Sequence, residues 1–463
     1  MEQYAKLHFV GIGGAGMSGI ARLLAQRGVE ITGSDLVESP RIDRLRQLGI
    51  KVFIGHRAEN LLQPQGVVVS SAVSPTNVEL VEARKRGIPI LSRAQMLGRL
   101  MADYDGIAIA GTHGKTTTTA MIGHMLAGCD ANPIVVIGGE CRDTGSNVRC
   151  GLGPHFVAEA DESDGSFLEL SPKTAVITNI EADHLEHYGS FGAIIDAFQA
   201  FLEKLPSDGL AILCSDDPQI KELLPQVKKH HLCYGFLPGA HVRGGGLALG
   251  PQGSRCPVYH GDRLLGTLEL RIPGRHNMLN ALAAVAVGLH LGYPFSQITD
   301  ALASFAGVNR RFHIIGERDD VLVVDDYAHH PTEIKATLAA ARTLGRRVIV
   351  VFQPHRYSRT YHLAGELATA FEGADEVIIT DIYAAGEAPI AGVSGEVLAE
   401  GVAEQKGSGV HYCGELGAIP GFLETIAQSG DLVLTMGAGN IDQVAHAYLN
   451  GVPGQLIGSG QRG

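Results

Sequence analysis

The sequence lacks the cysteine pattern of a disulfide scaffold or of a zinc site. Its seven cysteines include no C-x-x-C pair, and their number is odd. Apolar runs of the roughly 18–20 residues needed to span a bilayer are also missing. The first apolar stretch, residues 7–10, is short and is followed at once by glycines, which is not typical of a signal peptide. We therefore expect a cytoplasmic protein that does not insert into membranes.

Basic residues are too few for a nucleic-acid partner to be expected. Lys and Arg total 37 against 49 Asp and Glu, so the formal net charge is −12, and an acidic chain binds nucleic acid and anionic membranes poorly. Long polar tracts are absent, and with 45% hydrophobic residues a disordered chain is excluded. The 60 glycines follow no Gly-X-Y repeat, which excludes collagen and predicts many tight turns.

The order of apolar segments predicts three α/β domains. A chain of 463 residues is long enough for about three domains of roughly 150 residues each. Short strands alternate with helical segments from the N-terminus, begin again with a strand at 106–110 and begin once more after residue 310. This alternation is typical of parallel sheets that are covered by helices on both faces. We place the domains at residues 1–103, 104–309 and 310–463.

A glycine-rich turn, GIGGAG at residues 11–16, joins the first strand to the first helix. Glycines at such a turn let the backbone approach a diphosphate at the helix N-terminus. Asp35 ends the next strand, where a carboxylate can bond a ribose hydroxyl. A ligand-free turn would look similar, but the strand, helix and acid together favour a diphosphate. Because residues 1–103 are short for two mononucleotide-binding halves, a UDP-linked ligand competes with NAD.

The segment GTHGKTT at residues 111–117 is the strongest single signal for a bound nucleotide. It lies between a strand and a helix, so its backbone N–H groups can surround phosphates. Lys115 can reach the β and γ oxygens, and the Thr116 hydroxyl can bind Mg²⁺. The usual pattern has a further glycine five residues before Gly114, where this chain has Ile109. The loop is therefore a shortened variant, and it predicts Mg-ATP binding.

Two acidic segments follow strands of the second domain. EADESD at 159–164 and TNIEADH at 178–184 both place carboxylates at a strand end, and carboxylate oxygens are the ligands that Mg²⁺ prefers. Solvated acidic loops are common, so the assignment depends on the nearby phosphate-binding loop. A metal site near this loop is the prediction.

Polar or glycine loops follow four strands of the third domain, at 321–324, 347–352, 376–380 and 432–435. Ligands of open α/β sheets bind at the carboxyl ends of the strands, so a site is expected at this edge. Arg356 and Arg359 are spaced to hold a carboxylate or phosphate. The two histidines of DDYAHHP at 325–331 favour substrate contact or helix capping over a metal site.

Taken in order, these segments resemble the Mur ligases, ATP-dependent amide-forming enzymes of peptidoglycan synthesis. The resemblance runs from GIGGAGMSGIA at 11–21 to MGAGN at 436–440. Two segments are similar to the alanine-adding member in particular: GIGGAGMSGIA, and FQPHRYSRT at 352–360. It implies a Rossmann-like UDP-sugar-binding domain, a central P-loop ATPase-like domain and a Rossmann-like domain for the amino acid. It also implies UDP-N-acetylmuramate and L-alanine as substrates joined through an acyl phosphate, ATP and Mg²⁺ as cofactors, and a monomer or weak homodimer.

The resemblance further implies roles for individual residues. The UDP-sugar would be bound by Gly13, Gly14, Gly16, Asp35, His56 and Ser70. ATP would be bound by Gly111, Thr112, His113, Gly114, Lys115, Thr116, Thr117, His276, Asn277, Asn280, Arg310 and Asp326. The metal ligands would be Thr116, Glu159 and His184. The catalytic set would be Lys115, Glu159 and His184 with His329, Arg356 and Arg359, the last three near the reacting carboxylate and the incoming alanine.

One departure from the family concerns a carbamylated lysine, which several relatives carry after the metal-binding histidine. No lysine occurs between Lys173 and Lys204, and Phe198 and Gln199 stand at the aligned position. We expect the second metal site to be completed differently. Three alternatives stay open at this point: a paralogue that attaches a preformed peptide, a nicotinamide-dependent dehydrogenase, which would leave GTHGKTT unused, and a nucleotide sensor without catalysis.

Overall fold

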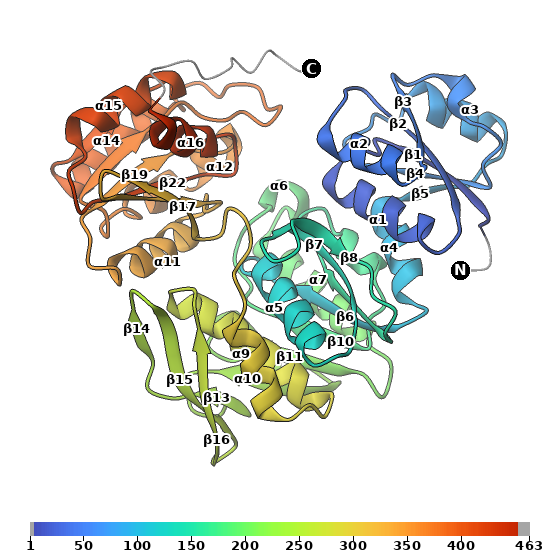
Figure 1. Cartoon of the computed structure of the whole chain (residues 1–463), viewed down its shortest axis with the longest axis horizontal. Coiled ribbons are helices and arrows are strands. Elements are labelled where there is room, and N and C mark those ends of the chain that lie inside the picture. The colour runs from blue at the N-terminus through green and yellow to red at the C-terminus, as the bar shows by residue number, and fades with distance from the viewer. Residues whose placement is uncertain (1–3, 452–463) are drawn as a thin grey trace. The chain divides into compact units, whose positions relative to one another are not determined.

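A computed structural model describes residues 4–451 (Figure 1). These residues form two compact units. The first holds the residues up to 246 together with 256–268 and 279–305, and the second holds 247–255, 269–278 and the residues from 306 on. Three β-sheets organise the chain, and the predicted mixed α/β class is confirmed. Within residues 4–451, no helix combines the length and the apolar character needed to cross a membrane.

The first sheet has five parallel strands in the order β3-β2-β1-β4-β5. Its strands are β1 (Lys6–Val10), β2 (Glu30–Asp35), β3 (Lys51–Ile54), β4 (Gly66–Val69) and β5 (Ile90–Ser92). Its helices are α1 (Ala15–Ala25), α2 (Pro40–Gln47), η1 (Ala58–Asn60), α3 (Val78–Lys85) and α4 (Arg93–Met101). The strand order reverses between β1 and β4, which is where sheets of this kind bind ligands, at the carboxyl ends of the strands.

The second sheet has eleven strands in the order β14-β15-β13-β12-β11-β10-β6-β9-β7-β8, with β16 paired to β15. Its strands are β6 (Asp105–Ala110), β7 (Ile134–Cys141), β8 (Ser146–Arg149), β9 (His155–Glu159), β10 (Thr174–Ile177), β11 (Leu210–Cys214), β12 (His230–Gly235), β13 (Val242–Gly244), β14 (Ala248–Gly250), β15 (Gly253–His260) and β16 (Arg263–Leu270). The accompanying helices are α5 (Lys115–Gly128), η2 (Ser166–Glu169), α6 (Leu185–Tyr188), α7 (Phe191–Glu203), α8 (Pro218–Leu223), η3 (Leu224–Gln226), α9 (Arg275–His290) and α10 (Phe295–Ala303). Strands β7 and β8 form an antiparallel hairpin that the sequence did not reveal.

The third sheet has six strands in the order β17-β18-β22-β19-β20-β21. They are β17 (His313–Arg318), β18 (Val321–Asp326), β19 (Val348–Phe352), β20 (Glu376–Ile379), β21 (Val410–Tyr412) and β22 (Leu432–Met436). The helices are α11 (Pro331–Arg342), α12 (Tyr357–His362), α13 (Ala364–Ala368), α14 (Gly395–Lys406), η4 (Leu416–Ala418), α15 (Ile419–Ile426) and α16 (Asp442–Asn450). The four strands predicted to precede polar loops, β18, β22, β19 and β20, are neighbours and parallel, so their loops share one edge.

Alternate residues of the third sheet supply two cores. Val350 of β19 faces a cluster with residues of α11, α13 and α14, whereas Ile349 faces a cluster with residues of α15 and α16. This alternation follows from the two-residue period of a strand, and it explains why β19 reads as one continuous apolar run. Helices on both faces leave the edges formed by the strand ends as the accessible places for ligands.

Candidate active site

The carboxyl edge of the first sheet brings together the residues predicted to bind a UDP-sugar. The backbone N–H of Gly13 donates to Asp35 Oδ2 at 2.8 Å, and Gly55 N–H, next to His56, donates to the carbonyl of Asp35 at 2.8 Å. A Cβ on Gly13 would lie only 2.9 Å from Asp35 Oδ2. The glycine therefore permits the close approach of the turn to the carboxylate.

Ser70 and Gly16 complete this edge. Ser70 follows β4, and a Cβ on Gly11 would lie 3.1 Å from the Ser70 Cβ. Gly14 precedes α1, whose first N–H groups are available to an anion because no side chain caps them. A Cβ on Gly16 would lie 2.9 Å from the Arg93 guanidinium, so a cation is close to the same turn.

The phosphate-binding loop is held by the end of β10. Asn179 accepts from Thr112 N–H through its carbonyl at 3.1 Å and from His113 N–H through Oδ1 at 2.8 Å. Thr178 Oγ1 donates to the His113 carbonyl at 2.6 Å. Gly114 has a φ of +80° and lies where a Cβ would come within 2.8 Å of Asn280 Oδ1. The loop shape is thus fixed by residues of two later segments, and Asn280, predicted to bind ATP, lies beside it.

Lys115 is engaged by three acceptors. Its Nζ donates to the carbonyls of Gly111 at 2.8 Å and Thr112 at 3.2 Å, and to Glu162 Oε1 at 2.8 Å. Only 13% of the lysine side chain and 3% of the glutamate side chain are exposed. Burial alone would lower the pKa of Lys115, but the nearby carboxylates raise it, Glu162 most strongly. The ammonium therefore stays charged at the place where a phosphate would be bound.

Glu162 is a site residue that the sequence analysis did not single out. It belongs to EADESD, where an acidic residue looks like part of a solvated loop. Its partner Lys115 lies 47 residues away in the sequence. Burial raises the pKa of Glu162 to about 7, although the Lys115 ammonium acts in the opposite direction. The structure thus assigns to Glu162 the task of holding the Lys115 ammonium over the loop.

Thr116 and Glu159, two of the predicted metal ligands, are in direct contact. The Thr116 hydroxyl donates to Glu159 Oε1 at 2.9 Å, and Gly138 N–H donates to Glu159 Oε2 at 2.6 Å. Glu159 ends β9 and Thr116 is the second residue of α5, so the two oxygens meet at the carboxyl edge of neighbouring parallel strands. A hydroxyl and a carboxylate are hard oxygen donors, which suits Mg²⁺.

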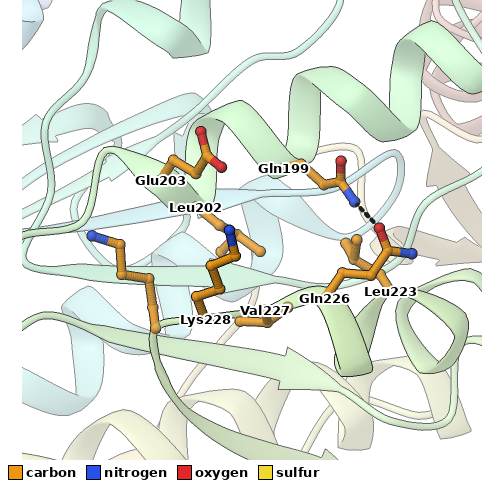
Figure 2. A pocket seen from close by; sticks show the side chains of 8 residues that line it. Gln199, Leu202, Glu203, Leu223, Gln226, Val227 and Lys228 are labelled. Atoms are coloured by element: carbon orange, nitrogen blue, oxygen red, sulfur yellow. Dashed lines mark hydrogen bonds between the residues drawn. The ribbon is translucent and has the colours of Figure 1, made fainter.

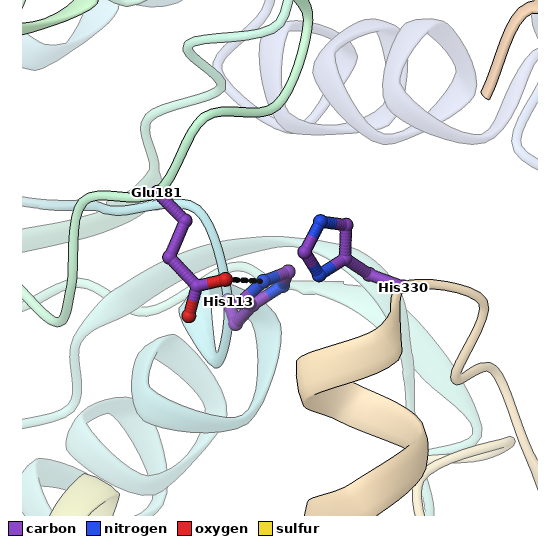
Figure 3. Close-up of side chains that lie close together, drawn as sticks. All are labelled: His113, Glu181 and His330. Carbon is purple, nitrogen blue, oxygen red and sulfur yellow. Dashed lines mark ion pairs between the residues drawn. The ribbon is translucent and has the colours of Figure 1, made fainter. Parts of the chain in front are cut away.

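His184 and His113 carry the other polar groups of this edge. His184 has a φ of +57° and lies with Nε2 3.5 Å from Asp183 Oδ2 and Nδ1 3.7 Å from Glu186 Oε1. His113 Nε2 lies 3.4 Å from Glu181 Oε2 (Figure 3). Acidic partners are thus supplied to both histidines by the TNIEADH segment, and metal ligation by His184 stays a prediction.

At the carboxyl edge of the third sheet, His329, His355 and Arg359 lie together. The rings of His329 and His355 are 5.7 Å apart, and Arg359 Nη1 lies 3.2 Å from His355 Nδ1. His355 stacks on Tyr383 with the rings 8° from parallel, and Arg356 N–H donates to the Tyr383 carbonyl. Two of the predicted loops are therefore joined, and His355 and Tyr383 are members that residue-by-residue prediction missed.

Burial keeps three histidines of the second unit neutral. It lowers the pKa of His329 to about 3, that of His355 to about 4 and that of His276 to about 4. The positive charges near these imidazoles are therefore carried by arginine side chains of the same unit. His330 caps α11 and forms a capping box with Glu333, which agrees with the predicted capping role of the paired histidines.

Arg310 and Asp326 both fasten the backbone of the second unit. Arg310 donates to the carbonyls of Gly437 and Gly439 and to Asp325 Oδ2. Asp326 accepts from Phe312 N–H at 2.6 Å and Ala328 N–H at 2.7 Å, and burial raises its pKa to about 6. Asn277 of α9 donates to the Pro273 carbonyl. Contact of these residues with ATP stays a prediction.

The position aligned with the carbamylated lysine is occupied by residues that cannot replace it. Phe198 is fully buried and packs against Phe167 with ring centroids 5.5 Å apart. Gln199 donates to Gln226 Oε1 at 2.7 Å beside a hollow of about 490 Å³ that is lined by Leu202, Glu203 and Lys228 among others (Figure 2). Neither side chain offers an amine that CO₂ could modify.

Activity is therefore expected not to depend on dissolved CO₂. Enzymes that rely on a carbamylated lysine lose activity when CO₂ is stripped, because the carbamate forms reversibly on a neutral amine. Turnover should be equal in degassed buffer and in buffer supplemented with bicarbonate at the same pH. A loss on degassing that bicarbonate restores would contradict the expectation and would require a lysine outside residues 174–203.

Comparison with known proteins agrees with this arrangement. Residues 6–105 match the Mur ligase family catalytic domain, residues 109–288 the Mur ligase middle domain, and residues 310–439 the domain described as Mur ligase, glutamate ligase domain. The chain is 50% identical over 448 residues to the UDP-N-acetylmuramate–L-alanine ligase of Trichlorobacter lovleyi, covering 96% of this chain and 98% of that protein. The corresponding ligase of Geobacter sulfurreducens is also 50% identical, with 96% and 97% covered.

Solved structures of related enzymes share the whole fold. The crystal structure of the UDP-N-acetylmuramate–alanine ligase of Thermotoga maritima has a TM-score of 0.80 and 32% identity, covering 96% of this chain and 98% of that one. A murein peptide ligase of Psychrobacter arcticus has a TM-score of 0.70 and 25% identity over 98% and 99%. The predicted family and its three-domain architecture are confirmed, and the chain belongs to the Mur ligase family.

Proposed function

We propose that this chain is an ATP-dependent ligase that joins L-alanine to the lactyl carboxylate of UDP-N-acetylmuramate, releasing ADP and phosphate. The observation that carries the proposal is 50% identity over 96% of the chain to proteins named for this reaction. The solved alanine-adding relative also exceeds the peptide-adding relative in both identity and TM-score. Attachment of a preformed peptide is the second candidate, and hydride transfer to a nicotinamide has no support in the family.

The chemistry requires activation, because a carboxylate and an amine do not condense at neutral pH. A lactyl carboxylate oxygen attacks the γ-phosphorus of ATP, which gives an acyl phosphate and ADP. The alanine nitrogen then attacks the acyl carbon, and the tetrahedral intermediate loses phosphate and a proton to give the amide. Both steps bring anionic oxygens together, so positioning and fixed cations supply most of the catalysis.

The loop at 111–117 supports binding of the ATP phosphates. Its backbone is fixed by Thr178 and Asn179, and the charged Lys115 ammonium is already in place above it. Thr116 and Glu159 would hold Mg²⁺, with His184 as a further ligand, and the ion would supply positive charge beside the transferring phosphoryl group. His276, Asn277, Asn280, Arg310 and Asp326 would contact the remainder of ATP. The central segment at 104–309 is accordingly the Mg-ATP domain.

The edges of the other two sheets support the two remaining substrates. Within residues 1–103, the turn at 13–16 would take the diphosphate and Asp35 the ribose, with His56 and Ser70 beside them. Within residues 310–463, the guanidinium groups of Arg356 and Arg359 suit the alanine carboxylate or the acyl phosphate. His329 is neutral there because burial lowers its pKa, so it can accept a hydrogen bond from the incoming amine.

An ADP-release assay with UDP-N-acetylmuramate and a panel of amino acids and peptides tests the proposal. L-Alanine is expected to support the highest kcat/KM, with glycine and L-serine lower because a missing methyl group or an added hydroxyl changes binding by about 1–3 kcal/mol. Omission of the sugar nucleotide should abolish ADP release. Turnover with a peptide but not with L-alanine would replace the proposal by the peptide-adding alternative.

A further inference from the structure

Glu79 is a fully buried carboxylate at the centre of a hydrogen-bond network in the first sheet. It lies in the first turn of α3, where a glutamate is ordinarily solvated, yet no part of its side chain is exposed. Its Oε1 accepts from Arg57 N–H at 3.1 Å and from Asn60 Nδ2 at 2.5 Å. Its Oε2 accepts from Ser34 Oγ at 2.6 Å and lies 3.3 Å from His8 Nε2.

The charge state of Glu79 follows from these bonds. Burial alone would raise its pKa, but the bonds from His8, Ser34 and Asn60 outweigh burial and lower the pKa to about 2. The group is therefore an ionised carboxylate, which can accept hydrogen bonds but cannot donate them. The single proton of the Ser34 hydroxyl must consequently point to Glu79.

This direction determines the tautomer of His56. Ser34 Oγ lies 3.0 Å from His56 Nδ1, and because its own proton is given to Glu79, it can only accept from that nitrogen. Neutral His56 must then carry its proton on Nδ1. Its Nε2 is left with a lone pair, so the series of hydrogen bonds that starts at Glu79 ends in an acceptor.

His56 lies where the nucleotide would be read. It follows β3 at the carboxyl edge, and the N–H of the preceding Gly55 donates to the carbonyl of Asp35, the residue proposed to take the ribose. Its side chain is 13% exposed, and within residues 4–451 the contacts described for its ring are made by Nδ1. The Nε2 lone pair is thus the polar feature that this ring can offer to a ligand.

We propose that Glu79 is a positioning residue for nucleotide selection: through Ser34 it fixes the His56 tautomer, so that Nε2 accepts a hydrogen bond from the ring N3–H of a uridine nucleotide. Uracil has a donor at N3, whereas cytosine has a lone pair there, which would face the lone pair of Nε2. The inference rests on the proposed UDP-sugar site and adds to it a physical basis for choosing uridine over cytidine.

The substitution Glu79→Gln reverses the direction of the hydrogen bonds that run from residue 79 through Ser34 to His56, while it keeps the shape of the side chain. Arg57 N–H and Asn60 Nδ2 are donors, and Asn60 also donates to the Gly55 carbonyl, so the amide oxygen of the new side chain must face them. The amide NH₂ then faces Ser34, whose hydroxyl becomes the donor to His56 Nδ1. His56 must move its proton to Nε2, which becomes a donor and suits the N3 lone pair of cytosine.

Two measurements on the full chain test the inference. The ¹⁵N spectrum of histidine-labelled protein at about pH 8.5, where a free imidazole is neutral, should show the His56 proton on Nδ1 in the wild type and on Nε2 in Glu79→Gln. The His56 signals are assigned by their loss in His56→Gln. Calorimetry with UDP and CDP, in the presence of saturating Mg-ADP to fill the phosphate loop, should show the UDP preference falling by about ten- to a hundredfold in Glu79→Gln.

Two further variants distinguish the effect of these hydrogen bonds from a general disturbance of the core. Thr32→Val removes a bond to His8 Nδ1 on the far side of Glu79 and leaves Ser34 untouched, so the tautomer and the preference should stay as in the wild type. Ser34→Ala removes the hydroxyl that links Glu79 to His56, so it should reduce the preference for UDP over CDP. This variant can be measured even if Glu79→Gln does not fold.

The outcomes also separate this inference from the proposed function. An unchanged tautomer, or an equal loss of UDP and CDP binding in Glu79→Gln, would overturn the inference while the wild type still binds UDP. Failure of the wild type to bind UDP would contradict the proposed UDP site and this inference together.

Discussion

Replacement of Lys115 by alanine is expected to lower the rate of ADP release by about 10³-fold or more. Removal of one preorganised cation or donor from a transition state typically costs 10²–10³ in kcat, and cations that act on a transferring phosphoryl group contribute up to about 10⁵. Lys115 is buried and charged, and it is held by Gly111, Thr112 and Glu162. The ammonium would supply a fixed positive charge to the γ-phosphate, and contact with a phosphate oxygen would replace one of its three present bonds. The measurement is single-turnover ADP release at saturating ATP and sugar nucleotide.

The control for this variant must deal with the partner that it leaves behind. Lys115→Ala leaves Glu162 buried without its cation. Because burial already raises the pKa of Glu162 to about 7, we expect the acid to take up a proton in this variant, and breaking the buried pair costs up to about 3–5 kcal/mol. The double variant Lys115→Ala with Glu162→Gln replaces the unpaired acid by a neutral amide of similar shape, and should recover part of the loss in unfolding free energy without recovering activity. Lys173→Ala, which removes a lysine with 58% of its side chain exposed, should be nearly neutral. ADP release close to the wild-type rate in either Lys115 variant would contradict the assignment of the phosphate loop.

Much of this arrangement was predictable from local patterns. The continuous apolar strands and the loops that follow them predicted both the parallel sheets and the edges at which Gly13, Lys115 and Arg356 lie. The strand predicted at 106–110 is observed as β6 (Asp105–Ala110), one residue longer at its start. Such patterns act over a few residues, and the parallel topology then places the strand ends side by side.

Partners that are distant in the sequence could not be predicted in this way. Glu79 and Glu162 look like surface acids, and only the fold brings His8 to the first and Lys115 to the second, over 71 and 47 residues. The hairpin of β7 and β8 escaped prediction because Gly138 and Gly139 interrupt its apolar run. The structure explains the glycine at position 138: the Gly138 N–H donates to Glu159, and a Cβ at this position would lie 2.9 Å from that carboxylate.

The charge of Glu159 is expected to be required for metal use. Glu159→Gln keeps the shape of the side chain, and Gly138 N–H, a fixed donor, should turn the amide oxygen toward itself. The amide NH₂ would then face Thr116 Oγ1, so that a donor replaces the carboxylate oxygen beside the other proposed ligand. A neutral amide is a much weaker ligand for Mg²⁺ than a carboxylate. We expect kcat to fall by about 10²–10³-fold, as for other losses of transition-state charge stabilisation.

Titration with Mg²⁺ distinguishes a ligand from a residue that only supports the loop. In Glu159→Gln the Mg²⁺ concentration that gives half-maximal ADP release should rise by about tenfold or more, since each 1.4 kcal/mol of lost binding is tenfold. Asp164→Asn is the matched control, because it removes one charge from the same acidic segment at a residue that accepts a hydrogen bond from Ser166 N–H. That variant should keep the wild-type Mg²⁺ dependence. A fall in kcat with an unchanged Mg²⁺ requirement in Glu159→Gln would show that Glu159 positions Gly138 and Thr116 and does not bind the ion.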